Sequence, residues 1–137
     1  MNYAIFALSI VAVIAFFLRG GKLHTHLALQ TESLLNRAGF ETRLEHPEKL
    51  PDGRLDFVDI LARRGEAMIF VEIETTPRYV LTNAAKAERL GIPLIIVVPS
   101  KKVQKEVKAR LRCSGLRPGG EQICILLLNH LNKELMN

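Results

Sequence analysis

The chain has little of what several common kinds of site require. Its two cysteines, Cys113 and Cys124, have neither CxxC spacing nor a nearby histidine pair, which argues against a zinc site and a disulfide framework. The GxxxxGK(S/T) and GxGxxG patterns of nucleotide-binding loops are absent, and so is the GxSxG pattern of serine hydrolases. No internal repeat or low-complexity segment is present. A reducing compartment fits this cysteine usage.

Composition and charge set the broad class. A chain of 137 residues, 48% of them hydrophobic, predicts one domain with a modest core and argues against disorder. The net charge of +5 favours anionic partners, either nucleic acid or an anionic membrane surface.

The first segment, residues 3–18, carries no charge and has Ser9 as its one strongly polar side chain. A helix of about 16 residues spans roughly 24 Å, a little less than a hydrocarbon core of ~30 Å. Basic residues before the segment and a small-x-small cleavage site after it are both absent, so a cleaved signal peptide is disfavoured. We predict an uncleaved membrane anchor at residues 1–20, and the alternative is a buried core helix.

The basic residues that follow the anchor set its orientation. By the positive-inside bias, Arg19 and Lys22 predict that the C-terminal domain, residues 21–137, lies in the cytoplasm. With this one anchor, we expect a single-pass membrane protein.

Patterns of period 3.6 and period 2 predict an α/β domain after the anchor. Because the almost wholly apolar strand at 93–99 follows the preceding strand through a helix, these two strands are expected to be parallel. The expected order is a helix at 22–38, a strand at 40–44, a loop at 46–54, strands at 55–62 and 67–74, a helix at 79–90, a strand at 93–99, a helix at 101–112, a strand at 122–128 and a short polar tail.

The most informative stretch is a predicted hairpin that carries three acids. Two apolar runs flank Arg-Arg-Gly-Glu at 63–66, which is typical of two strands joined by a tight turn. Burying a carboxylate is costly unless it is paired or binds a metal, so Asp59, Glu72 and Glu74 each require a reason. Side chains alternate along a strand, which puts Glu72 and Glu74 on one face. The pattern suggests a cation site.

The order of elements and acids resembles the PD-(D/E)xK nuclease superfamily, and within it the archaeal Holliday junction resolvase-like branch. The similarity covers roughly residues 22–100 and rests on three short motifs. It implies a restriction endonuclease-like mixed β-sheet flanked by helices over residues 21–137. The motifs are Thr31-Glu32-Ser33-Leu34-Leu35, Val58-Asp59-Ile60 and Val71-Glu72-Ile73-Glu74.

The resemblance implies roles for four acids. Glu32 matches the acid of the first helix, Asp59 the motif aspartate, and Glu72 the first acid of the (D/E)xK strand. Val58 stands where proline is usual, and Glu74 stands where the catalytic lysine is usual. Some restriction endonucleases of the superfamily have Glu-x-Glu at this site and are active.

The chemistry of phosphodiester cleavage suits these residues. One or two Mg²⁺ (or Mn²⁺) ions held by carboxylates activate water and stabilise the charge of the transition state. Asp59, Glu72 and the carbonyl of Ile73 are suitable oxygen ligands, and Glu32 would complete the site through a water. Glu74 is either a further ligand or the general base, if neighbouring acids raise its pKa.

Other residues have plainer interpretations. Asp52 lies in a Pro-Asp-Gly turn, so Asp59 is preferred as the motif aspartate. His24 and His26 point to different helix faces, and no ligand cluster of histidines is visible. Lys86 could replace the missing lysine from the next helix, but a solvated helix charge is the preferred interpretation.

Three functions remain open at this point. The leading one is a membrane-tethered, metal-dependent endonuclease that hydrolyses DNA. The second is a catalytically inactive module of the same fold that binds nucleic acid or a protein partner at the membrane. The third is an anchored interaction protein whose basic helix at 101–112 contacts anionic lipid. The partners expected are DNA, the membrane through the N-terminal helix, and a second copy of the chain as a homodimer.

Overall fold

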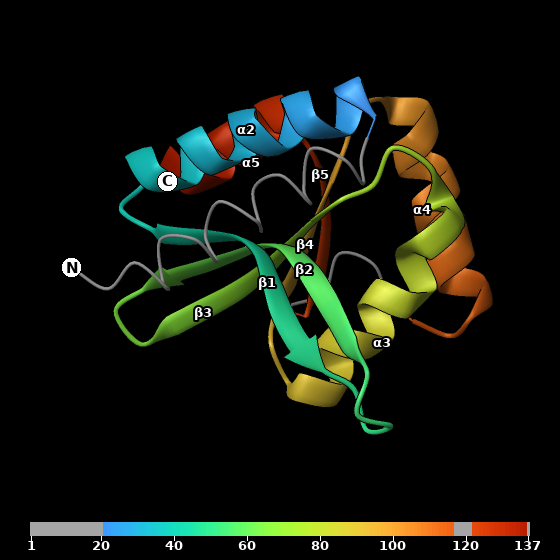
Figure 1. Ribbon diagram of the computed structural model, residues 1–137. Helices are drawn as coiled ribbons and strands as arrows, with labels where there is room; N and C mark the ends of the chain where they lie inside the picture. Colours follow the sequence, from blue (N-terminus) through green and yellow to red (C-terminus); the bar gives the residue numbers. More distant parts are fainter. Residues whose placement is uncertain (1–20, 117–121, 137) are drawn as a thin grey trace.

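Five strands form one mixed sheet with helices on both faces in the computed structural model, which describes residues 21–116 and 122–136 (Figure 1). The predicted α/β class is therefore confirmed. The elements are α2 (Lys22–Arg37), β1 (Glu41–Lys49), β2 (Leu55–Arg64), β3 (Ala67–Ile73), the 3-10 turn η1 (Pro77–Tyr79), α3 (Val80–Leu90), β4 (Leu94–Val98), α4 (Lys101–Cys113), β5 (Ile123–Leu127) and α5 (Leu128–Met136).

The sheet combines an antiparallel half with a parallel half. Its strand order is β1-β2-β3-β4-β5, with β1, β2 and β3 joined as antiparallel neighbours. Strands β3, β4 and β5 run parallel, so the parallel pairing expected across the α3 crossover is confirmed.

Two hydrophobic clusters hold the helices on opposite faces of the sheet (Figure 1). On one face, α2 and α5 lie side by side and contribute Leu27, Leu35 and Leu131 to a cluster with β2 and β3 residues. On the other face, α3 and α4 contribute Ala84 and Val107 to a cluster centred on β4 and β5. The central strands of the sheet are thus buried between two helical layers, whereas the edge strand β1 is largely exposed.

The turn between β2 and β3 follows the predicted hairpin. Gly65 has a φ of 60°, in the left-handed region that a residue without a side chain adopts at little cost. The pairs Arg64 with Ala67 and Arg63 with Met68 close the hairpin directly around this turn.

Two expectations about the chain are wrong. Strand β1 continues to Lys49, because β1 is an edge strand and Pro47, which has no N–H to donate, is tolerated there. The predicted polar tail is the helix α5 instead. Its apolar residues Leu128, Leu131 and Leu135 recur at helical spacing, and all three pack into the cluster under α2.

The predicted membrane anchor at residues 1–20 lies outside the described residues. Among the helices at 21–116 and 122–136, none is both long enough and apolar enough to cross a bilayer.

Candidate functional site

The site forms where β2 and β3 stop pairing. Their last backbone pair on this side joins Ile60 to Val71. Beyond it, the Ile73 N–H donates to Asp59 Oδ2 at 2.8 Å, and the Asp59 N–H donates to Glu72 Oε2 at 3.3 Å. Two carboxylates therefore satisfy backbone donors at the point where the ladder ends, and they hold the strand ends in place.

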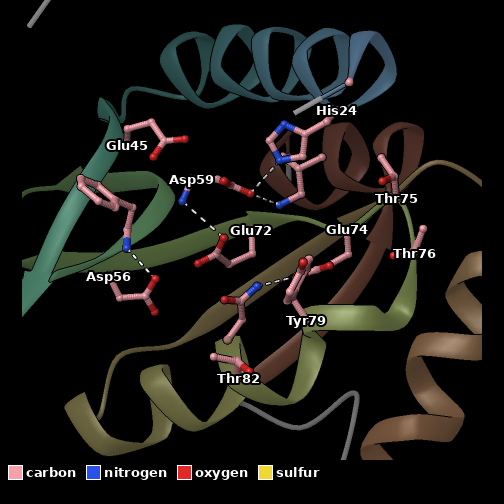
Figure 2. A pocket seen from close by; sticks show the side chains of 14 residues that line it. His24, Glu45, Asp56, Asp59, Glu72, Glu74, Thr75, Thr76, Tyr79 and Thr82 are labelled. Atoms are coloured by element: carbon pink, nitrogen blue, oxygen red, sulfur yellow. Dashed lines mark hydrogen bonds and ion pairs between the residues drawn. The ribbon is translucent and has the colours of Figure 1, made fainter. Parts of the chain in front are cut away.

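A cavity of about 450 Å³ opens at this point, and it lies in the size range of small-molecule sites (Figure 2). Its walls come from the start of α2, from β1, β2 and β3, from the segment after β3, and from α3. The structure brings together four of the predicted site residues in this cavity: Asp59, Glu72, Ile73 and Glu74.

Glu32 does not join them. It does not line the cavity, and its Oε2 accepts a hydrogen bond from Thr42 Oγ1 at 3.1 Å instead. Glu32 is therefore the one predicted site residue that the structure does not bring into the cavity.

His24, two turns earlier on α2, takes that position over the acids. Its Nε2 lies 3.2 Å from Asp59 Oδ2 (Figure 2). Burial lowers the pKa of His24, but the contact with Asp59 and the neighbouring carboxylates outweigh burial, so the pKa is raised. The sequence showed no ligand cluster of histidines, and His24 was not among the predicted site residues. No spacing in the sequence links it to Asp59, because the contact depends on how α2 packs on the sheet.

Glu45 on β1 is a further acid of the cavity. The pairs Leu44 with Ile60 and His46 with Val58 set Glu45 opposite Asp59 across the two strands. Its side chain is 4% exposed, and its φ of 49° lies in the left-handed region, which is uncommon for a residue other than glycine and tends to occur at functional sites. Glu45 was not among the predicted site residues, because the first strand was expected to end at Leu44.

Lys86 is not solvated, contrary to the preferred interpretation of the sequence. It is 2% exposed, and its Nζ lies 3.2 Å from Glu72 Oε1 and 3.2 Å from Asp56 Oδ2. The Phe57 carbonyl accepts a further hydrogen bond from Nζ at 2.8 Å. Burial lowers the pKa of Lys86, but the two carboxylates more than offset it and raise the pKa, so this lysine is charged at neutral pH.

Glu72 on β3 and Glu74, which follows β3, have raised pKa values for the same main reason. Burial raises the pKa of Glu72 well above its usual range, the charge of Asp59 adds to this, and Lys86 opposes it. Burial also raises the pKa of Glu74 to about 7, although a hydrogen bond from the Asn83 amide opposes the shift. Glu74 thus has a basicity suited to taking a proton near neutral pH.

The raised pKa of Glu74 predicts a pH-dependent stability. A folded-state pKa of about 7 against an ordinary value of 4.5 means that the folded chain binds this proton more tightly than the unfolded chain does. The free energy of unfolding should therefore fall by about 3 kcal/mol as the pH rises from about 4.5 to 7, relative to the Glu74→Gln variant. Urea unfolding of both proteins in EDTA measures the difference. Parallel pH profiles would contradict the assigned shift.

The oxygen atoms of the cavity provide some, but not all, of the ligands that the expected magnesium ion requires. Within the described residues, no group of three or more histidine, cysteine, aspartate or glutamate side chains is arranged to hold a metal ion. Mg²⁺ commonly uses one or two protein carboxylates and completes its shell with water and substrate phosphates. Asp59 and Glu72 fit that pattern, since the buried Glu72 Oε1 accepts no hydrogen bond and has only the ion contact to Lys86. Ile73 contacts Asp59 through its N–H.

Comparisons with known proteins add little. No protein-family model matches the chain, and no curated protein matches it. The crystal structure of AF1548, a protein of unknown function, is similar over 66% of this chain with 19% sequence identity and a TM-score of 0.45. The chain spans 56% of that protein. This distant structural match assigns no activity.

Proposed function

We propose that the chain is a membrane-tethered, metal-dependent endonuclease that hydrolyses phosphodiester bonds in DNA. The observation that carries the proposal is the meeting of Asp59 and Glu72 in a cavity at the end of the β2–β3 ladder, with the buried Lys86 paired to Glu72. Buried carboxylates at a cavity wall are costly, and binding a divalent cation is one of the few arrangements that offsets the cost.

The proposal includes the finer fold assignment, a restriction endonuclease-like sheet of the PD-(D/E)xK superfamily. It is supported by the order α2-β1-β2-β3-α3-β4, which is the order that the resemblance implies. It is also supported by the register, which sets Asp59 and Glu72 on neighbouring strands at the same level.

Asp59 and Glu72 would hold the metal ion, which supplies water activation and charge stabilisation when bound. Glu74 accepts a proton from the attacking water, for which a pKa of about 7 is well suited. The phosphorus–oxygen bond to the leaving nucleotide breaks as the new bond to the water oxygen forms, and the leaving oxygen takes its proton from solvent.

Lys86 has a positioning role in this scheme. It is not among the residues that line the cavity, but its Nζ lies 3.2 Å from Oε1 of Glu72, which does line it. Its charge opposes the protonation of Glu72 that burial would otherwise cause. Lys86 therefore supplies a positive charge to the acids without taking the place in the strand where lysine is usual.

The second candidate function is a module of the same fold that binds nucleic acid or a protein partner without cleaving it. One observation favours it: Glu74 occupies the lysine position, and Lys86 does not reach the cavity. The two candidates differ in one measurable property, which is metal-dependent turnover.

The experiment that tests the proposal is a cleavage assay of the full chain in detergent with Mg²⁺, Mn²⁺ or EDTA. Single-stranded, duplex and branched DNA are offered at low salt, because phosphate binding weakens steeply as salt increases. The proposal expects cleavage of at least one form with metal and none in EDTA. DNA binding without cleavage of any form would contradict the endonuclease proposal and support the second candidate, the binding module.

The tether is part of the proposal, with residues 1–20 crossing the membrane once and the domain in the cytoplasm. It rests on the uncharged run at 3–18 and the basic residues after it. Full-length protein should sediment with membranes and resist alkaline carbonate extraction, whereas a protein starting at Gly21 should not sediment. Full-length protein in the carbonate-soluble fraction would contradict the tether.

A further inference from the structure

The rim of the cavity has an exposed aromatic side chain beside a cation. Tyr79 in η1 lines the cavity and is 56% exposed (Figure 2). The guanidinium of the exposed Arg78 lies over the Tyr79 ring, 5.1 Å from its centroid. The 3-10 turn that carries both residues is capped by Thr76, whose hydroxyl accepts a hydrogen bond from the Arg78 N–H.

The topology brings further positive charge to the same edge of the sheet. Strands β3 and β4 are parallel neighbours, so η1 and α4, which follow their carboxyl ends, begin on the same side. Helix α4 packs against η1. Its first two residues, Lys101 and Lys102, are exposed.

We propose that Tyr79 and Arg78 at the cavity rim, together with Lys101 and Lys102 at the start of α4, bind an unpaired nucleic-acid strand, with one base stacked on Tyr79 and the neighbouring phosphates on the basic side chains. Aromatic rings stack on bases of any sequence, and cations beside them follow the phosphate backbone. In an intact duplex the base faces are stacked on one another, so a ring at a cavity rim reaches them only at an unpaired or extruded nucleotide.

The inference rests on the proposed function in one respect, because it makes the bound strand the substrate of the acidic cavity. It names a substrate class: single strands, flaps, or unpaired nucleotides of a branched structure. Stacking on Tyr79 would place the next phosphate beside the cavity that Asp59, Glu72 and Glu74 line. Lipid headgroups also carry phosphate, but they have no planar face for the exposed ring.

The test measures binding of the full chain to a fluorescent single strand and to a blunt duplex of the same sequence, in EDTA to prevent cleavage. The wild type should bind the single strand more tightly. Tyr79→Ala should weaken that binding roughly 5- to 150-fold, the range expected when one base–aromatic stack is removed, and Tyr79→Phe should retain it. The matched control is Leu90→Ala, which removes an exposed apolar side chain at the other end of α3 and should change nothing.

Two further readouts separate stacking from charge. A 2-aminopurine base in the strand should decrease in fluorescence on binding to wild type and Tyr79→Phe, but not to Tyr79→Ala. The salt dependence is the slope of the logarithm of the binding constant against the logarithm of the salt concentration. The double variant Lys101→Ala/Lys102→Ala should reduce the magnitude of this slope by roughly 0.7 for each phosphate that is no longer neutralised, whereas Tyr79→Ala should leave the slope unchanged.

The outcomes distinguish this inference from the proposed function. Equal affinity for duplex and single strand, or a Tyr79→Ala variant that binds like wild type, overturns the inference even if the protein cleaves DNA. Tyr79-dependent binding of the single strand without cleavage in any metal supports the inference and removes the enzymatic proposal. A lysine variant with reduced affinity for phosphatidylserine vesicles and unchanged DNA binding overturns it in favour of lipid contact.

Discussion

Metal-dependent cleavage should fall roughly 10³-fold or more in either Asp59→Asn or Glu72→Gln, because a bound metal ion supplies several kcal/mol of transition-state stabilisation and each ~1.4 kcal/mol is tenfold in rate. Both substitutions keep the shape of the side chain and an oxygen that can accept the backbone N–H groups of Asp59 and Ile73. What they remove is the negative charge that holds a divalent cation. Initial cleavage rates and Mg²⁺ titration measure the effect.

The matched control for charge is Asp52→Asn. Asp52 lies in the exposed turn between β1 and β2, where its partner is Arg54, and it does not line the cavity. Its loss should leave cleavage within about twofold of wild type, as expected for a surface change away from the site. Urea unfolding of all three variants shows whether folding has changed. Cleavage that survives Glu72→Gln in a folded protein would remove Glu72 from the site.

Lys86→Met should destabilise the domain by about 3–5 kcal/mol at pH 7, because it leaves the buried carboxylate of Glu72 without its cation. The loss should shrink as the pH falls. Burial and Asp59 raise the pKa of Glu72 and Lys86 opposes them, so without Lys86 the carboxylate takes up a proton at higher pH and the folded state gains stability on acidification. Thermal or urea unfolding between pH 5 and 8 measures both effects.

Two further variants test whether the loss of stability in Lys86→Met comes from its buried pair with Glu72. Lys101→Met removes a lysine from an exposed helix position and should cost less than about 0.5 kcal/mol. Adding Glu72→Gln to Lys86→Met should restore part of the stability, because the unpaired charge is then absent. A cost for Lys86→Met as small as that for Lys101→Met would show that Lys86 is not buried against Glu72.

The sequence predicted the sheet well where side-chain patterns are local. The apolar strand at 93–99, the turn at Gly65 and the acids at Asp59 and Glu72 follow from alternation, glycine and the cost of burying charge. Strand β4 and its parallel pairing with β3 therefore needed no tertiary information.

The rest of the site depends on contacts between distant elements. Lys86 has the sequence surroundings of a surface lysine, and only the packing of α3 on the sheet brings it to Glu72 and Asp56. His24 reaches Asp59 through the packing of α2 in the same way. The position of Glu45 could have been predicted from the sequence. If β1 is extended past Leu44, a hairpin turn centred on residues 51–53 sets Glu45 opposite Asp59.

The point where β2 stops pairing with β3 divides the sheet into two parts that are expected to differ in the free energy of local opening. Residues 55–59 of β2, which precede Ile60, pair with β1 alone, so the start of β2 and the end of β1 form a projecting arm (Figure 1). The arm is joined to the body by the buried Val58, by the contacts of Lys86 with Asp56 and the Phe57 carbonyl, and by the hydrogen bonds that link Asp59 to Glu72 and Ile73. Segments with fewer packed neighbours open at a lower free energy than the core does. The end of the arm is therefore expected to open at a lower free energy than β3, β4 and β5, which separates local opening of these strand ends from global unfolding.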